Sequence, residues 1–256
     1  MFSKDIYIQR RQRLKKDIGS GIILLLGNEE AGMNYKDNCY RFRQDSSFLY
    51  FTGLDKPSLA LVIDIDGDKE IMIGDEASID DIVWMGTQAS LSELASAAGI
   101  EMVKPVSNLE AIIKNAIVTK QAVHFLPAYR PENSIKLGYL LGISLKEVKD
   151  KASIPLIKAV VAQRSIKSTE EIKEINKAVN TSNEMHLAAM RITKEGLRES
   201  EVAGVIEGIA ISAGGNISYP VIYTVNGQTL HNHATSNVMK KGQLVLCDAG
   251  AETAMH

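Results

Sequence analysis

The hydrophobic positions in the first part of the chain alternate between helical and strand-like spacing. From about residue 3 to residue 17 they recur at helical spacing, which predicts an amphipathic helix. The run GIILLLGN (21–28) is almost wholly apolar, which predicts a strand covered on both faces. FLYFTGL (48–54) also predicts a strand, and LALVIDIDGDKEIMIGD (59–75) predicts two strands joined by a turn at Asp66-Gly67-Asp68.

Helical and strand-like segments continue to alternate up to about residue 163. AVHFLPAY (122–129) predicts a further strand. Helical spacing is found over 90–98, 107–117, 133–140 and 155–163. Such alternation indicates an α/β domain with a mixed sheet and flanking helices.

The pattern changes after residue 167. Ser168 stands three residues ahead of Glu171, the spacing of a capping box at the start of a helix. One face of this long helix is predicted to be buried, and its residues are Ile172, Ile175, Val179, Ser182, Met185 and Ala189. A second helix is predicted from about Ser200 to Ala213, because Gly214-Gly215 follows it.

Three strand-like segments follow the two helices: SYPVIYTV, QTLHNH and QLVLCDAG. Two helices followed by strands predict an α+β domain. The boundary lies near residues 150–167, so we expect one domain over 1–155 and another over 156–256.

Composition and charge exclude several classes of protein. Of the 256 residues, 45% are hydrophobic and 23% are charged, with a net charge of −2, so nothing favours nucleic acid or an anionic membrane as a partner. The two cysteines, Cys39 and Cys247, form no disulfide framework. No signal-peptide-like stretch occurs at the N-terminus, and the apolar run GIILLLG is too short to span a bilayer. We expect a cytoplasmic protein.

Asp248 is the first candidate for a functional residue. It follows the apolar run of QLVLCDAG and precedes Ala249-Gly250. A carboxylate at the end of a buried strand is suited to binding a metal. Aspartate before Ala-Gly is equally suited to forming a turn, and the stretch alone leaves both readings open.

His231, His233 and Trp84 are the other candidates. In a strand, His231 and His233 would lie on the same face, where they could bind a metal, polarise a carbonyl or stabilise an oxyanion. They could equally be polar residues at an exposed strand end. Trp84, the only tryptophan, is either a packing residue or a wall against a substrate or a neighbouring subunit.

The stretch YRFRQDSSFLYFTGLDKPSLALVI resembles the N-terminal domain of aminopeptidase P and its prolidase and creatinase relatives. The resemblance continues, in the order found in the family, through DIVWMG, RSIKSTEEIKEI and YPVIYTVNGQTLHNHATSNVMKKGQLVLCDAGAE. It implies a creatinase-type N-terminal domain followed by a pita-bread catalytic domain made of two similar halves. Such a domain holds two divalent metals, usually manganese, although its ligands also accept zinc or cobalt.

The resemblance also implies roles for single residues. Asp248 matches the first metal-binding aspartate of the family. His231 matches a histidine that contacts substrate and stabilises the tetrahedral intermediate, and His233 beside it is a weaker candidate for substrate contact. Trp84 resembles a tryptophan that, in some members, reaches towards the active site of another subunit, so a homo-oligomer is implied.

The family's metal site needs further ligands: a second aspartate, a histidine and two glutamates, all of which would follow residue 256. One carboxylate and one or two imidazoles cannot offset the repulsion between two divalent cations. We therefore expect this chain to be the first part of a longer enzyme, with an incomplete pita-bread domain, and to be inactive alone. Its last strand should be poorly ordered or protected by another copy.

The activity implied for the parent enzyme is metal-assisted hydrolysis of the peptide bond before proline, on peptides with proline at the second position. Aminopeptidase P and prolidase specificity both remain open. Two alternatives are a non-catalytic binding or oligomerisation module and a metal-free, creatinase-like hydrolase. Asp248 argues against both, because a site without metal does not need an aspartate at the ligand position.

Overall fold

The computed structural model describes residues 1–255 and divides into two compact units. The first unit is Met1–Ile166 and the second begins at Lys167. The division falls inside the expected boundary region of 150–167, at its late end and beyond the expected domain limit at residue 155. The reason is α8 (Ile154–Ser165), whose residues Leu156, Ala159 and Val160 are buried in a core of the first unit. None of the described helices is both long enough and apolar enough to cross a membrane.

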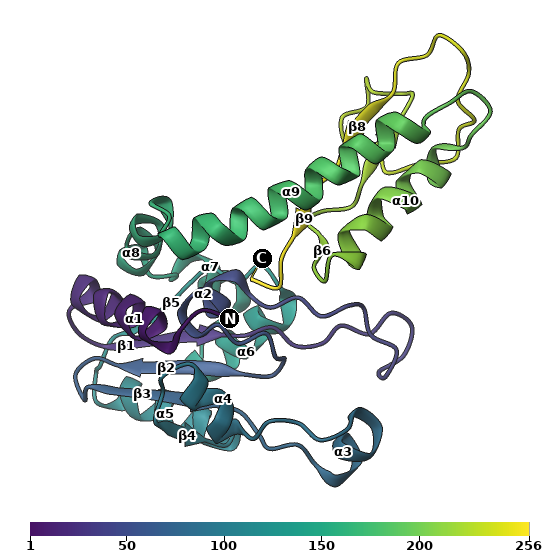
Figure 1. Ribbon diagram of the computed structural model, residues 1–256. Coiled ribbons are helices and arrows are strands. Elements are labelled where there is room, and N and C mark those ends of the chain that lie inside the picture. Colours follow the sequence, from purple (N-terminus) through teal and green to yellow (C-terminus); the bar gives the residue numbers. More distant parts are fainter. Residues whose placement is uncertain (256) are drawn as a thin grey trace. The chain divides into compact units, whose positions relative to one another are not determined.

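The first unit is built on one five-stranded mixed sheet, in the order β4-β3-β2-β1-β5 (Figure 1). The strands are β1 (Ile22–Leu26), β2 (Ala60–Asp64), β3 (Lys69–Ile73), β4 (Met102–Lys104) and β5 (Val123–Phe125). The central strand β2 pairs antiparallel with both β1 and β3, whereas β5 pairs in parallel with β1 and β4 in parallel with β3. This confirms the predicted α/β unit and the hairpin over 59–75.

Helices cover both faces of this sheet, which explains why β1 is apolar at every position. Besides α8, the helices of the unit are α1 (Lys4–Ile18), α2 (Ser46–Thr52), α3 (Ile79–Met85), α4 (Leu91–Ala97), α5 (Ser107–Val118), α6 (Pro131–Leu141) and α7 (Leu145–Asp150). Ile23 and Leu25 belong to a core shared with α1, α2, α4 and α8, whereas Ile22 and Leu24 belong to a core shared with α5, α6 and α7.

The strand predicted over 48–54 is wrong, because these residues lie in or directly after α2. Asp45 caps this helix by accepting hydrogen bonds from the backbone N–H groups of Ser47 (2.9 Å) and Phe48 (2.8 Å). Gly53 ends it in the left-handed conformation, with φ of 72°. Capping at both ends therefore outweighs the strand preference of the aromatic residues between them.

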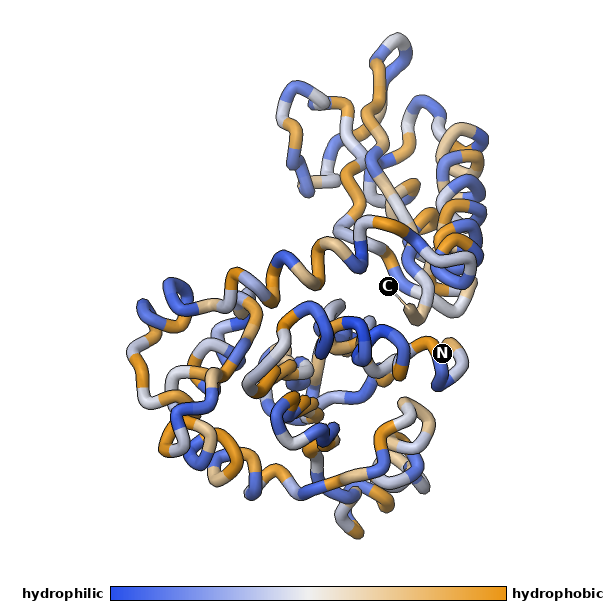
Figure 2. Tube along the Cα trace, turned by 90° about the vertical axis from the view of Figure 1, so that its left-hand side faces the viewer, coloured by the Kyte–Doolittle hydropathy of each residue, from blue (hydrophilic) through white to orange (hydrophobic). Residues whose placement is uncertain are grey.

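The second unit has the predicted α+β composition. Its elements are α9 (Thr169–Ile192), α10 (Glu199–Ser212), β6 (Asn216–Ile217), β7 (Ile222–Thr224), β8 (Leu246–Asp248) and β9 (Ala251–Glu252). The strands form two antiparallel pairs, β6 with β9 and β7 with β8. Ser168 and Glu171 form the predicted capping box at the start of α9. Hydrophobic and hydrophilic residues alternate along the helices, as Figure 2 shows.

Only the second half of α9 has the predicted buried face. Met185 and Ala189 are buried in the core that α9 shares with α10, whereas Ile172, Ile175 and Val179 are exposed. The reason is length: α9 has 24 residues and α10 has 14, so the first part of α9 extends past its partner helix.

Two strand predictions for the second unit are also corrected. QTLHNH is turn and irregular structure, because no neighbouring strand pairs with it among the described residues. QLVLCDAG is not covered on both faces, since Leu244 is 90% exposed and, among residues 1–255, β8 pairs with β7 alone. The expected disorder or protection of this segment by another copy stays a prediction, and His256 lies outside the described residues.

One buried side chain, Arg11 of α1, joins three elements of the first unit. Its guanidinium donates hydrogen bonds to the carbonyls of Phe51 (2.9 Å), Ala98 (3.0 Å) and Gly99 (3.0 Å), at the C-terminal ends of α2 and α4. Its Nε donates to Glu70 of β3 at 2.7 Å. Burial lowers the pKa of Arg11, and the carboxylate of Glu70 opposes that shift. Carbonyls that α2 and α4 leave unpaired thus find their donor in α1.

We predict that Arg11→Met lowers the free energy of unfolding by about 3–5 kcal/mol, because it leaves buried carbonyls without their donor and Glu70 with Lys15 as its remaining cationic partner. Urea unfolding followed by circular dichroism measures the change. Arg13→Met is the matched control, since Arg13 is on the same helix but its side chain is 58% exposed. Equal losses for the two variants would contradict the assigned role of Arg11.

Candidate functional site

Asp248 ends β8 with its side chain exposed, opposite Ile222 of β7. Its carboxylate accepts a hydrogen bond of 2.7 Å from the hydroxyl of Tyr219, which lies between β6 and β7. The backbone strand pairing and the phenol together hold this carboxylate at the protein surface. The carboxylate of Asp248 is thus oriented by a second side chain.

Tyr219 was missed by the sequence analysis. Its pKa is raised to about 12, first because its hydroxyl donates to Asp248, then because of partial burial and the negative charge of Asp248. Losing the proton would place two negative oxygens side by side, so the protonated phenol is favoured. The two residues are 29 positions apart, and no local pattern links them.

Polar contacts with side chains of α9 hold the turn that follows Asp248. His186 Nε2 lies 3.0 Å from the carbonyl oxygen of Ala249, and Ser182 Oγ accepts from the backbone N–H of Ala251 at 2.9 Å. Cys247 Sγ lies 3.8 Å from His186 Nδ1. A proton on Nε2 satisfies the Ala249 carbonyl and leaves Nδ1 free to accept from the thiol. Burial, followed by the charge of Asp248, raises the pKa of Cys247.

His231 and His233 are both exposed in the irregular segment that follows β7. They are not residues of a strand, so the argument that alternation brings them to one face does not apply. Asn232 between them donates a hydrogen bond of 3.0 Å to the buried hydroxyl of Thr224. Within the described residues, no hydrogen bond or ion pair joins either imidazole to Asp248.

The donor groups do not by themselves fit a complete metal site. Across residues 1–255, no three His, Cys, Asp or Glu side chains are grouped so that they could hold a metal ion. Asp248 supplies a single carboxylate, whereas a divalent metal site needs several oxygen or nitrogen ligands. Any metal bound by Asp248 requires ligands in addition to those that the structure describes.

Trp84 belongs to the first unit and is 84% exposed on α3, a helix with no buried residue. Ile79, Val83 and Met85 of the same short helix are also exposed. The interpretation of Trp84 as a packing residue of its own unit is therefore wrong. Its indole is free to contact another molecule.

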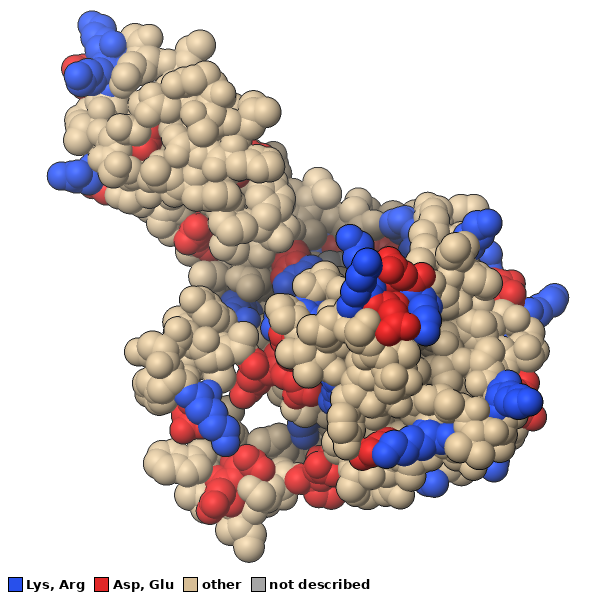
Figure 3. Space-filling model, turned by 180° about the vertical axis from the view of Figure 1, so that it is seen from behind, with Lys and Arg blue, Asp and Glu red and all other residues tan. Residues whose placement is uncertain are grey.

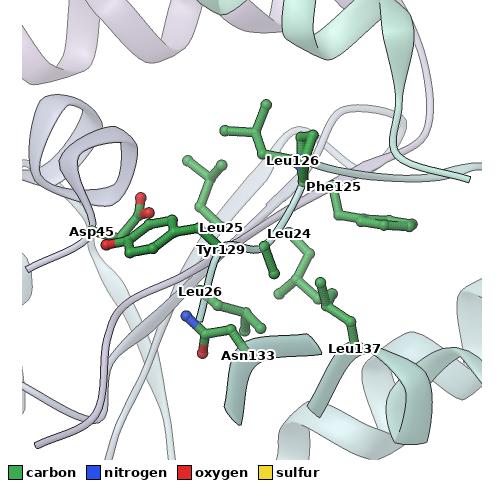
Figure 4. Close-up of a pocket in the computed structure, with 11 residues that line it drawn as sticks. Leu24, Leu25, Leu26, Asp45, Phe125, Leu126, Tyr129, Asn133 and Leu137 are labelled. Atoms are coloured by element: carbon green, nitrogen blue, oxygen red, sulfur yellow. The ribbon is translucent and has the colours of Figure 1, made fainter. Parts of the chain in front are cut away.

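A small cavity of about 40 Å³ lies in the first unit (Figure 4). Most of its lining residues are apolar and come from β1 and the segment around Phe125, and Asp45 and Asn133 also line it. This volume suits one or two water molecules rather than a substrate. The cavity contains none of the candidate residues.

Two families match successive parts of the chain. Residues 7–124 match the family described as aminopeptidase P, N-terminal domain. Residues 173–255 match metallopeptidase family M24. The first match lies within the first unit, and the second within the second unit.

Curated relatives that match the chain are named as probable Xaa-Pro aminopeptidases. A probable Xaa-Pro aminopeptidase of Chaetomium globosum is 30% identical over 250 residues, covering 95% of this chain and 41% of the relative. Another from Sordaria macrospora is 31% identical over 240 residues, covering 91% of this chain and 40% of the relative. The chain thus spans about two fifths of the length of these relatives.

Solved structures share the fold. Aminopeptidase P of E. coli matches with a TM-score of 0.83 and 23% identity, over 99% of this chain and 60% of that chain. The Pseudomonas aeruginosa aminopeptidase matches with a TM-score of 0.82 and 23% identity over the same shares. The fold therefore corresponds to an N-terminal domain and part of a pita-bread catalytic domain. Together with the family matches and the curated relatives, it establishes that the chain belongs to the aminopeptidase P type of metallopeptidase family M24.

Proposed function

We propose that this chain is part of a metal-dependent peptidase that hydrolyses the peptide bond before proline, on peptides with proline at the second position. The observation that carries the proposal is the Asp248 carboxylate, oriented by Tyr219 within the segment that matches family M24. The relatives named as probable Xaa-Pro aminopeptidases favour an aminopeptidase over a dipeptidase.

Asp248 is proposed to be a ligand of a divalent metal in a dinuclear site, with manganese as the native ion. A solved E. coli aminopeptidase P is described as zinc-substituted and in complex with product, which supports a divalent metal in this type of enzyme. Such metals polarise a scissile carbonyl and lower the pKa of water. Because no second and third donor joins Asp248 among residues 1–255, the other ligands must come from elsewhere.

His231 is proposed to donate a hydrogen bond to the oxyanion of the tetrahedral intermediate, and His233 to contact the substrate. Both imidazoles are exposed, as a contact with an incoming peptide requires. Asn232 is tied to Thr224 between them, so the segment is anchored where the two histidines project. A preorganised donor of this kind stabilises charge that develops in the transition state.

Trp84 is proposed to contact a second copy of the chain near its substrate site, in a homodimer or larger homo-oligomer. The exposed apolar residues around Trp84 on α3 support this proposal, because water-exposed apolar patches mark interaction surfaces.

A cytoplasmic location is proposed from the two unpaired cysteines. Basic and acidic side chains lie next to one another over the face in Figure 3, which favours no polyanionic partner.

We predict that the isolated chain does not hydrolyse an Xaa-Pro peptide in the presence of manganese and binds no manganese stoichiometrically. The physical reason is that one carboxylate cannot hold two divalent cations. Peptide assay by mass spectrometry and calorimetric titration measure the two outcomes. Turnover together with two tightly bound ions would overturn the ligand argument.

We also predict that activity returns when residues 1–255 are joined to the part of E. coli aminopeptidase P outside its matched 60%. In this fusion Asp248→Asn should lower kcat/KM for an Xaa-Pro peptide by at least about 100-fold. Loss of a residue that only hydrogen-bonds to a metal ligand lowers activity by about 10- to 100-fold, so a larger loss indicates a direct ligand. Asp17→Asn, on an aspartate of α1, is the control. A folded fusion that cleaves Xaa-Ala as readily as Xaa-Pro would contradict the proposed specificity.

The contact between Tyr219 and Asp248 predicts how the pKa of Tyr219 changes when Asp248 is replaced. The pKa of Tyr219, about 12, should fall towards its ordinary value of 10 in Asp248→Asn, because the neighbouring negative charge is removed. NMR of ¹³C-labelled tyrosine in the 256-residue chain measures this shift. Tyr223 is the internal control, since burial is the main cause of its raised pKa. An unchanged Tyr219 would show that Asp248 does not hold the phenol.

A further inference from the structure

The segment that carries His231 and His233, residues 225–237, is called the histidine loop. Its downstream end is fastened to the start of α10. The backbone N–H of Asn237 donates to Glu199 Oε2 at 3.2 Å, and its side-chain Nδ2 donates to both carboxylate oxygens at 3.1 and 3.0 Å. In return, the N–H of Glu199 donates to the carbonyl of Asn237 at 3.0 Å.

The upstream end of the histidine loop meets the same carboxylate. The backbone N–H of Val225, directly after β7, donates to Glu199 Oε1 at 2.7 Å. One side chain therefore receives hydrogen bonds from the first and the last residue of the loop. The residues between them include the two exposed histidines, whose own side chains do not fasten the loop to the core.

Burial makes this attachment strong. Glu199 has 0% exposed surface, and each partner found for its carboxylate is an amide N–H group. A buried carboxylate is costly unless hydrogen bonds satisfy it, so the native position of both loop ends is energetically coupled to Glu199. As the first residue of α10, it also lies where the helix dipole favours negative charge.

We propose that Glu199 is a positioning residue: its buried carboxylate clamps both ends of the histidine loop and thereby sets where His231 and His233 project. The importance of these histidines for catalysis rests on the proposed function. The clamp itself is a property of this chain and is tested without any assay of activity.

A clamp and a general packing role lead to different results. If Glu199 only filled the core, its replacement would destabilise α10, β7 and the histidine loop alike. If it acts as a clamp, the loss is confined to the loop ends. The isosteric variant Glu199→Gln separates the two, because an amide keeps one acceptor oxygen and places a donor NH₂ against one of the loop's N–H groups.

The experiment is amide hydrogen exchange measured by NMR on the 256-residue chain. In Glu199→Gln, the amide of Val225 or of Asn237 should exchange roughly 10- to 100-fold faster, as expected for losing a hydrogen bond to a charged group. Amides in the middle of α10, such as that of Ile206, should keep their rates. Glu201→Gln is the matched control, since this exposed carboxylate on the same helix accepts from Arg198 rather than from the loop.

A second variant keeps the test informative if Glu199→Gln does not fold. Asn237→Ala removes the side-chain Nδ2 bonds to Glu199 and keeps the backbone N–H, so the backbone amide at position 237 should exchange faster while that of Val225 stays protected. The side-chain ¹⁵N resonances of His231 and His233 should sharpen in the same variant as the loop gains mobility. Unchanged rates at both loop ends, or uniform acceleration throughout the second unit, would overturn the clamp.

The Glu199 clamp and the proposed peptidase activity can be rejected independently of each other. Faster exchange at the loop ends, with no loss of Xaa-Pro hydrolysis by the fusion carrying Glu199→Gln, would keep the clamp and reject the proposed role of the histidines. Unchanged exchange, with activity that still depends on Asp248, would reject the clamp and keep the peptidase.

Discussion

Buried backbone groups at the ends of helices, strands and loops must find hydrogen-bond partners, and in each unit one buried charged side chain supplies several of these partners at once. In the first unit Arg11 meets part of this need, since it donates to three carbonyls at the ends of α2 and α4 and is paired with Glu70, while capping side chains such as Asp45 meet it at helix N-termini. In the second unit Glu199 accepts from N–H groups at both ends of the histidine loop. The charges are opposite because carbonyls need a donor and N–H groups need an acceptor.

The same constraint shapes the surroundings of Asp248. The carboxylate is exposed, but the backbone on its C-terminal side is fixed by His186 and Ser182 of α9, and Tyr219 orients its oxygen. Rigid backbone behind an accessible acceptor is the arrangement that a metal ligand needs. The second unit thus combines an anchored acidic residue with a histidine-bearing loop whose ends are anchored separately.

Apolar surface is distributed unequally over the chain. Helices cover both faces of the five-stranded sheet, and its strands β1 and β2 are buried at four of their five positions. By contrast, α3 and the first half of α9 expose large apolar side chains, including Trp84 and Val179. Surfaces of this kind are usually covered in a functional assembly, which agrees with the proposal that this chain works together with further polypeptide.

Local patterns in the sequence determined most of the elements. A continuous apolar run identified β1, the turn residues at 66–68 identified the hairpin over 59–75, and helical spacing identified the long helices. The Ser168 capping box located the start of α9. All these signals lie within a few residues of one another. The quoted motifs carried the family resemblance. Composition alone predicted a strand over 48–54, but capping by Asp45 and Gly53 makes most of this segment a helix.

Only the tertiary structure decided how the candidate residues are held. Tyr219 and Asp248 are 29 residues apart, Glu199 and Asn237 are 38 apart, and Arg11 and Gly99 are 88 apart. No periodicity of a helix or strand relates such positions, because their contact follows from how the elements pack. For the same reason QTLHNH resembled a strand in sequence but found no partner to pair with, and its histidines instead occupy a loop fastened at both ends.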